Sequence, residues 1–199
     1  MCKPARFPKT KPSPKQKPAL LAAFLFGTLL GYGVASYRQE VPAPTTSDKA
    51  IVQVRFSPGG HCTQWVEHII AKAQKTILVQ AYAFTSLPIA NALIKAHQKG
   101  IIVKLLVDRS QRTGKYTQVP RMLAHGIPVL IDKAAGIAHN KVMILDDAYV
   151  LTGSFNWTKA AETRNAENLL LIQDATIHQA YTTTWHQRAA RAQPLPAGP

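Results

Sequence analysis

Four polar residues in two neighbouring stretches could act together on one anionic group. His139 and Lys141 stand at the start of an apolar run, and Ser154 and Asn156 follow a glycine shortly afterwards. Side chains alternate along a β-strand, so His139 shares a face with Lys141, and Ser154 shares a face with Asn156. On adjacent strands, an imidazole, an ammonium, a hydroxyl and a carboxamide would then converge.

This combination of groups suits a phosphodiester. An imidazole can attack phosphorus or move a proton near neutral pH. A lysine and an amide can stabilise the non-bridging oxygens as negative charge develops on them. The sequence has no HExxH motif, no paired CxxC motifs and no aspartate pair facing the same way as His139. We therefore expect no metal ion and no cofactor.

The apolar run at residues 142–145 is the element that must hold His139 and Lys141. Four apolar residues between polar ones are typical of a buried strand. Asp146 ends the run with the opposite parity from His139, so we expect it to be structural rather than reactive. Strands and helices are predicted to alternate around this run, which indicates an α/β fold. The predicted strands are residues 51–56, 76–84, 101–108, 127–131, 148–151 and 167–173. The predicted helices are residues 61–74, 87–98, 119–125 and 175–190.

The spacing HxKxxxxD followed by GSxN resembles the signature of the phospholipase D superfamily. The likeness is greatest to the small bacterial endonucleases with one copy of the motif, and it runs from about Val52 to about Arg188. Such a resemblance implies a mixed β-sheet flanked by helices. It also implies that Glu167, at the start of a later strand, hydrogen-bonds His139 and orients it, as the third member of a triad does.

One motif histidine leaves the reaction incomplete. Displacement at phosphorus needs a nucleophile on one side and an acid on the other. Larger members of the superfamily carry two motifs and build one site between two similar halves. The resemblance therefore implies that this chain is one half and forms a two-fold homodimer with a composite site. His139 of one subunit would form a phosphohistidine, while the partner's His139 would protonate the leaving group. Lys141 and Asn156 would hold the phosphoryl oxygens, and Ser154 would assist.

The formal net charge of +14 favours an anionic partner. Residues 1–18 hold six basic residues and no acidic one, which leaves +8 on the remainder. Nucleic acid, and DNA before RNA, is the expected substrate of a metal-independent, non-specific endonuclease. Two alternatives stay open: a phospholipase D acting on phosphatidylcholine or cardiolipin, and a membrane-tethered nucleic-acid-binding protein without turnover. A polar loop offers three candidate phosphate contacts, although a solvated loop would look the same: Arg109, Arg112 and Lys115.

The N-terminal part of the chain differs in composition from the rest. Residues 1–18 are rich in proline and lysine and are expected to be disordered. Residues 19–37 carry no charge and, at about 1.5 Å each, would nearly span a hydrocarbon core of roughly 30 Å. A basic flank before such a run predicts a signal peptide or a membrane anchor. Residues 38–49 would then link it to a catalytic domain at 50–192, on the non-cytoplasmic side (periplasmic or secreted in a bacterium). We expect a loose tail at residues 193–199.

Overall fold

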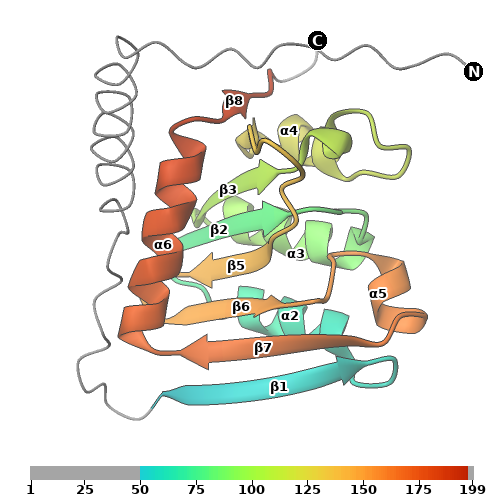
Figure 1. Ribbon diagram of the computed structural model, residues 1–199, viewed down its shortest axis with the longest axis vertical. Coiled ribbons are helices and arrows are strands. Elements are labelled where there is room, and N and C mark those ends of the chain that lie inside the picture. Colours follow the sequence, from blue (N-terminus) through green and yellow to red (C-terminus); the bar gives the residue numbers. More distant parts are fainter. Residues whose placement is uncertain (1–49, 197–199) are drawn as a thin grey trace, which may run out of the picture. The chain divides into compact units, whose positions relative to one another are not determined.

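Strands and helices alternate along residues 50–196, which are the residues that the computed structural model describes (Figure 1). The predicted disordered region, the signal or anchor, and the linker up to residue 49 lie outside these residues. Within residues 50–196, no helix combines the length and the apolar character needed to cross a bilayer.

Eight strands form one mixed sheet in the order β1-β7-β6-β5-β2-β3-β4-β8. Strands β2, β3 and β4 are parallel to one another, and every other neighbouring pair is antiparallel. The predicted α/β class with a mixed sheet flanked by helices is confirmed. The strands are β1 (Ile51–Ser57), β2 (Thr76–Ala81), β3 (Ile102–Val107), β4 (Val129–Ile131), β5 (Lys141–Leu145), β6 (Tyr149–Gly153), β7 (Glu167–Gln173) and β8 (Gln193–Pro194).

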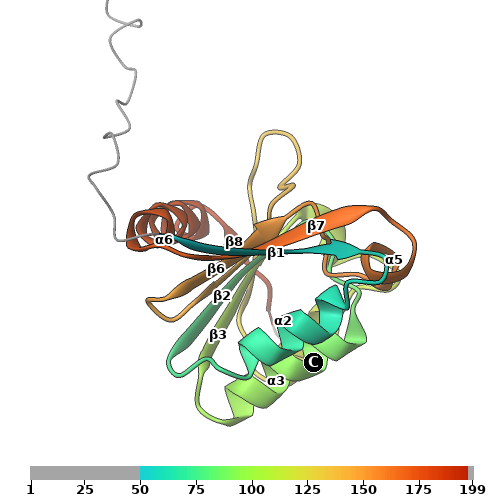
Figure 2. The same ribbon diagram turned by 90° about the horizontal axis from the view of Figure 1, so that it is seen from below.

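Helices cover both faces of this sheet, as Figure 2 shows. Helices α2 and α3 lie together on one face, and the long α6 lies on the other. Strand β5 is buried along its whole length because it serves both cores: Met143 and Leu145 face α2 and α3, whereas Val142 and Ile144 face α6. The helical elements are α2 (Cys62–Ile70), α3 (Leu87–Gln98), the 3₁₀ turn η2 (Arg109–Arg112), α4 (Val119–Ala124), α5 (Lys159–Thr163) and α6 (Ala175–Ala189).

Two buried tryptophans, one on each side of the sheet, bind the central strand β2. The indole N–H of Trp157, on the α2 side, donates to the Gln80 carbonyl at 3.0 Å. The indole N–H of Trp185, on α6, donates to the Val79 carbonyl at 3.2 Å. Each ring thus buries its apolar surface while its one donor is satisfied. Both tryptophans belong to the core.

Several element boundaries differ from the predicted ones. Helix α2 ends at Ile70 rather than at residue 74, because the backbone N–H groups of residues 74–76 bind the Asp146 carboxylate instead of continuing the helix. Strand β2 ends at Ala81, because the chain beyond it pairs with other loops. Helix α5 was not predicted; its N-cap is Thr158. The tail expected to be loose from residue 193 instead adds β8 to the edge of β4.

Candidate active site

The candidate site lies at one edge of the sheet, where five strand ends meet. Strand β5 begins there and β6 ends there, because the two are antiparallel; β7 begins beside them. Strands β2 and β3 also end at this edge, on the right in Figure 1. The residues singled out from the sequence on β5, β6 and β7 therefore converge through topology, although they are far apart along the chain.

His139 and Lys141 contact each other directly. The Lys141 Nζ lies 2.9 Å from Nδ1 of His139 and donates to the His139 carbonyl oxygen at 2.6 Å. The lysine side chain is only 5% exposed, whereas the histidine is open to solvent. The imidazole can thus meet a substrate directly, and the ammonium lies behind it. The two side chains are together, as the sequence predicts, although His139 precedes β5 instead of lying in it.

The ammonium of Lys141 is largely shielded from solvent. Burial lowers the pKa of Lys141, and the negative charge of Glu167 offsets part of that effect. A desolvated cation gains more from an incoming phosphoryl oxygen than a hydrated one does, because fewer waters compete for it.

Tyr82 is a site residue that sequence reasoning missed. Its ring centroid lies 4.3 Å from that of His139, and the Lys141 Nζ lies 4.9 Å from the same ring. Both functional groups therefore lie against the same aromatic ring. The sequence offered one signal, an aromatic residue near the end of the strand predicted at 76–84. Only the pairing of Ala81 with Lys141 in the structure shows that this strand lies beside the motif.

Glu167 occupies the site but not in the expected contact. Its Oε1 accepts a hydrogen bond from Asn165 Nδ2 at 2.9 Å, instead of one from His139. Its influence on the site is electrostatic, through Lys141. The alternation of side chains along a strand does not determine which of two nearby groups a flexible carboxylate binds.

Ser154 and Asn156 follow β6 in a tight turn against β7. Ser154 Oγ accepts from the Asn168 backbone N–H at 3.0 Å, and a Cβ on Gly153 would collide with the Asn168 carbonyl oxygen. This close approach explains the glycine of the GSxN stretch. The amide oxygen of Asn156 is buried without a hydrogen-bond partner within residues 50–196. A half-turn of that amide would place its donor there, as a phosphoryl oxygen requires.

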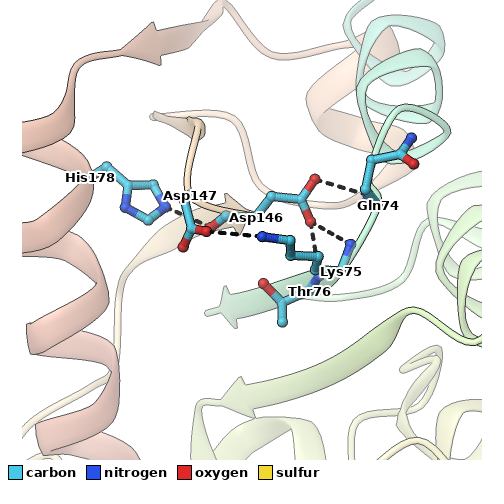
Figure 3. Close-up of polar contacts among 6 residues, drawn as sticks. All are labelled: Gln74, Lys75, Thr76, Asp146, Asp147 and His178. Carbon is cyan, nitrogen blue, oxygen red and sulfur yellow. Dashed lines mark hydrogen bonds and ion pairs between the residues drawn. The ribbon is translucent and has the colours of Figure 1, made fainter.

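Asp146 lies at the opposite end of β5, roughly 15 Å along the strand from the motif lysine. Its carboxylate accepts from the backbone N–H groups of Gln74, Lys75 and Thr76 at 2.7–2.9 Å, and its carbonyl lies 2.9 Å from His178 Nε2 (Figure 3). Burial raises the pKa of Asp146, but the three N–H bonds and the Lys75 charge outweigh this and lower it. The residue joins β5 to β2 and to α6, away from the reactive groups.

The basic loop after β3 reaches the same sheet edge as His139. Its first turn is η2, capped by Asp108, and its three basic side chains are exposed: Arg109, Arg112 and Lys115. Tyr116 follows, with the Lys115 Nζ 5.3 Å from its ring. Among the described residues, no group of three or more histidine, cysteine, aspartate or glutamate side chains is placed to hold a metal ion.

Comparison with known proteins gives one family. Residues 66–188 match the family model described as "Cardiolipin synthase, PLD-like domain". The chain is 42% identical over 139 residues to phospholipase D of Rickettsia conorii, covering 70% of each chain. It is 30% identical over 113 residues to mitochondrial cardiolipin hydrolase of Xenopus tropicalis, covering 57% of this chain and 54% of that one.

Two solved structures share the fold over nearly their whole length. Nuc from Salmonella typhimurium, a phospholipase D family member, is 35% identical with a TM-score of 0.69, covering 74% of this chain and 99% of that one. NucT from Helicobacter pylori is 23% identical with a TM-score of 0.70, covering 74% and 100%.

Proposed function

The chain belongs to the phospholipase D superfamily, and we propose that it is an endonuclease that cleaves DNA by phosphoryl transfer to His139 without a metal ion. Membership confirms the resemblance inferred from the motifs, and the chain is a phosphodiester hydrolase. The non-catalytic alternative is therefore not retained. The observation that carries the nuclease proposal is the buried Lys141 ammonium against an exposed imidazole, on a sheet edge that also carries the basic turn η2.

The charge on this edge favours a polyanion over a single phosphate. The acidic side chains of the surrounding loops are already engaged: Asp108 by backbone N–H groups, Asp132 by Arg188, and Glu162 by the Thr63 N–H. The exposed basic side chains of the same loops make no ion pair with an acidic side chain within residues 50–196, although Arg109 lies close enough to Asp108 to act on its charge. They are Arg109, Arg112, Lys115, Lys133, Lys159 and Arg164. A nucleic-acid backbone, with many phosphates at regular spacing, can bind several of them at once.

The contact between Lys141 and His139 sets the order of the first step. A protonated lysine can only donate, so Nδ1 of His139 accepts from it, and the neutral imidazole carries its proton on Nε2. Neither ring nitrogen then has a free lone pair. The substrate's phosphoryl oxygen must draw Nζ away before His139 can attack. Exchange with solvent would then remove the proton from Nε2 and place one on Nδ1, where Glu167 in its predicted role would accept its hydrogen bond, and Nε2 would be free to attack.

The reaction needs two imidazoles in turn. The nitrogen of His139 attacks phosphorus, an N–P bond forms, and the bond to the leaving oxygen breaks. The partner's His139 gives its proton to that oxygen. Water then attacks phosphorus, passes a proton to the same imidazole, and the N–P bond breaks. Lys141 and Asn156 stabilise the non-bridging oxygens, with Ser154 assisting.

A surface for the second copy adjoins the site. Val52, Val54 and Phe56 alternate along β1 and share one face, and Phe56 is 63% exposed. Phe56 pairs with Asn168, which binds Ser154, so this apolar strip ends beside the candidate site. An exposed apolar strip of this kind is typical of a surface that another chain covers. We assign it to the homodimer that the composite site requires. If residues 19–37 direct export, the enzyme acts on the non-cytoplasmic side.

A phospholipase D acting on membrane phospholipids is the second candidate. The names of the relatives in Rickettsia and Xenopus favour it. One structural feature does as well: the loop leading to His139 has a largely apolar tip at residues 134–137, and Ile137 is 55% exposed. Such a tip suits contact with a lipid surface.

A direct comparison of substrates separates the two candidates. The full-length chain is incubated in excess EDTA with plasmid DNA, RNA, and vesicles of phosphatidylcholine or cardiolipin, beside His139→Ala as the matched inactive control. We expect the DNA to be nicked and linearised while the lipids persist. Release of choline or phosphatidic acid, with intact DNA, would assign the enzyme to lipids instead.

A further inference from the structure

The carboxylate of Asp108 is one of the most buried acidic groups in the described part of the chain, with 2% exposure. It stands directly after β3, at the sheet edge of the candidate site. Its Oδ2 accepts the backbone N–H of Ala138 at 2.8 Å, and its Oδ1 accepts the backbone N–H of Ser110 at 2.9 Å. One side chain thus joins two segments that are separate in sequence.

These two segments are the ones that meet the substrate. Ala138 immediately precedes His139, and Ser110 lies within the basic turn η2. His139 itself is outside β5, so no strand pairing fixes its backbone. The chain around it is instead held by three bonds: the Ala138 N–H donates to Asp108, the Asn140 carbonyl accepts from the Tyr82 N–H at 3.1 Å, and the His139 carbonyl accepts from Lys141 Nζ.

We propose that Asp108 is a positioning residue that fixes the backbone of His139 for attack and sets its distance from the basic turn η2. This inference rests on the proposed role of His139 in phosphodiester cleavage. A carboxylate is suited to the task because its two oxygens can accept both N–H groups at once. Burial raises the pKa of Asp108, but the Ser110 and Ala138 bonds and the Arg109 charge lower it overall, so both oxygens remain acceptors near neutral pH.

The loop before His139 supplies a matched control. Its start is held by Asp132, a buried carboxylate that binds Arg188 of α6 through two bonds of 2.7 and 2.8 Å. Between this anchor and Ala138 the chain is mostly exposed. A small displacement at residue 132 can therefore relax before it reaches His139, whereas a displacement at residue 138 cannot.

The test measures the full-length chain on bis(p-nitrophenyl) phosphate, a small diester that needs neither DNA nor lipid recognition. Because errors of about 1 Å in placement can cost on the order of a hundredfold in rate, we expect Asp108→Ala to lower kcat at least tenfold. The change in KM should stay within about threefold, since a substrate this small depends little on the basic turn. The burst of p-nitrophenolate, which reports phosphohistidine formation, should slow equally. Asp108→Asn keeps one acceptor and should fall between Asp108→Ala and the unchanged chain.

The control is Asp132→Asn, whose kcat should stay within about threefold of the unchanged chain. Thermal unfolding establishes which variants fold; if Asp108→Ala does not, Asp108→Asn decides the question. A folded Asp108 variant with unchanged kcat, or an equal loss in Asp132→Asn, would overturn the inference. Hydrolysis that survives in His139→Ala would instead refute the role of His139, and with it the proposed function, which keeps the two failures distinct.

Discussion

The functional groups of Lys141 and His139 are bound to each other: the ammonium nitrogen of the lysine lies 2.9 Å from Nδ1 of the imidazole. In the proposed mechanism, this contact keeps His139 from attacking until a phosphate competes for the ammonium. Because the lysine is buried and the histidine is exposed, the competing group has to arrive from the histidine side. In that mechanism, substrate binding is the event that begins activation of His139.

The first prediction concerns the alkaline limit of activity. The rate requires a protonated Lys141, and burial lowers the pKa of that group, so kcat should fall with rising pH earlier than an ordinary lysine would allow. An arginine stays charged throughout this range, so Lys141→Arg should be slower but should lose this alkaline limb. A pH–rate profile of both proteins checks it. An identical limb in the arginine variant would assign the titration to another group.

The second prediction separates Asp146 from its neighbour. Asp146→Ala removes the acceptor of three backbone N–H groups and should lower the free energy of unfolding by about 2–3 kcal/mol. Asp147 makes only an exposed ion pair with Lys75 at 3.6 Å, so Asp147→Ala should change it by less than about 0.5 kcal/mol. Urea unfolding measures both. Equal effects would mean that the N–H contacts contribute little.

The third prediction is acid sensitivity. Asp108 and Asp146 both have pKa values lowered by backbone N–H bonds, so their stabilising effect is complete above the unfolded-state pKa of about 3.9. It should be lost as the pH falls from there through the lower folded-state values. Urea midpoints between pH 6 and 2.5 should fall less steeply in Asp146→Asn, which no longer titrates at this position. Parallel curves would contradict the prediction.

The fourth prediction concerns ions. Since Lys141 and Asn156 supply the charge stabilisation, nuclease activity should survive excess EDTA. DNA binding should weaken linearly in a plot of log affinity against log salt, with a slope near −0.9 for each phosphate contact on duplex DNA. Arg112→Ala should reduce that slope by about one contact. Activity that is lost in EDTA and restored by magnesium would contradict the metal-independent mechanism. A flat salt response would show that the exposed basic side chains do not bind the DNA backbone.

The fifth prediction concerns the shared site. A tandem fusion of one unchanged copy and one His139→Ala copy retains a single motif histidine, which cannot act as both nucleophile and acid. Its turnover should fall far below half that of a fusion of two unchanged copies. Half-activity would show that each chain carries a complete site.

The dimer surface can be tested separately. Phe56→Glu places a charge on the exposed apolar strip of β1 and should shift the sedimentation of the full-length chain towards a monomer.

The sequence was informative where neighbours along the chain decide the structure. The apolar run of β5 and the bounds of α3 and β7 follow from local periodicity, and the structure has them. Gly100, with φ of +89°, ends α3 as such a glycine does.

Contacts between distant segments could not be derived in this way. Tyr82, after β2, contacts His139, and Asp108, after β3, binds the N–H of the preceding Ala138; nothing local in the sequence marks either contact. The early end of α2 depends on Asp146, about seventy residues further along the chain. Glu167 was placed at the site by resemblance, but its hydrogen bond goes to Asn165.

The two indole bonds to β2 have a consequence for how the sheet opens. Trp157 and Trp185 donate hydrogen bonds to consecutive carbonyls of β2, and they belong to the cores on opposite faces of the sheet. Separating β2 from α6 therefore breaks the Trp185 bond, and separating it from the segment between β6 and α5 breaks the Trp157 bond, whereas β1 and β8 lie at the edges of the sheet with exposed residues. In deuterated water, the amides of β1 and β8 should exchange first and those of β2 last, at a rate set by unfolding of the whole domain.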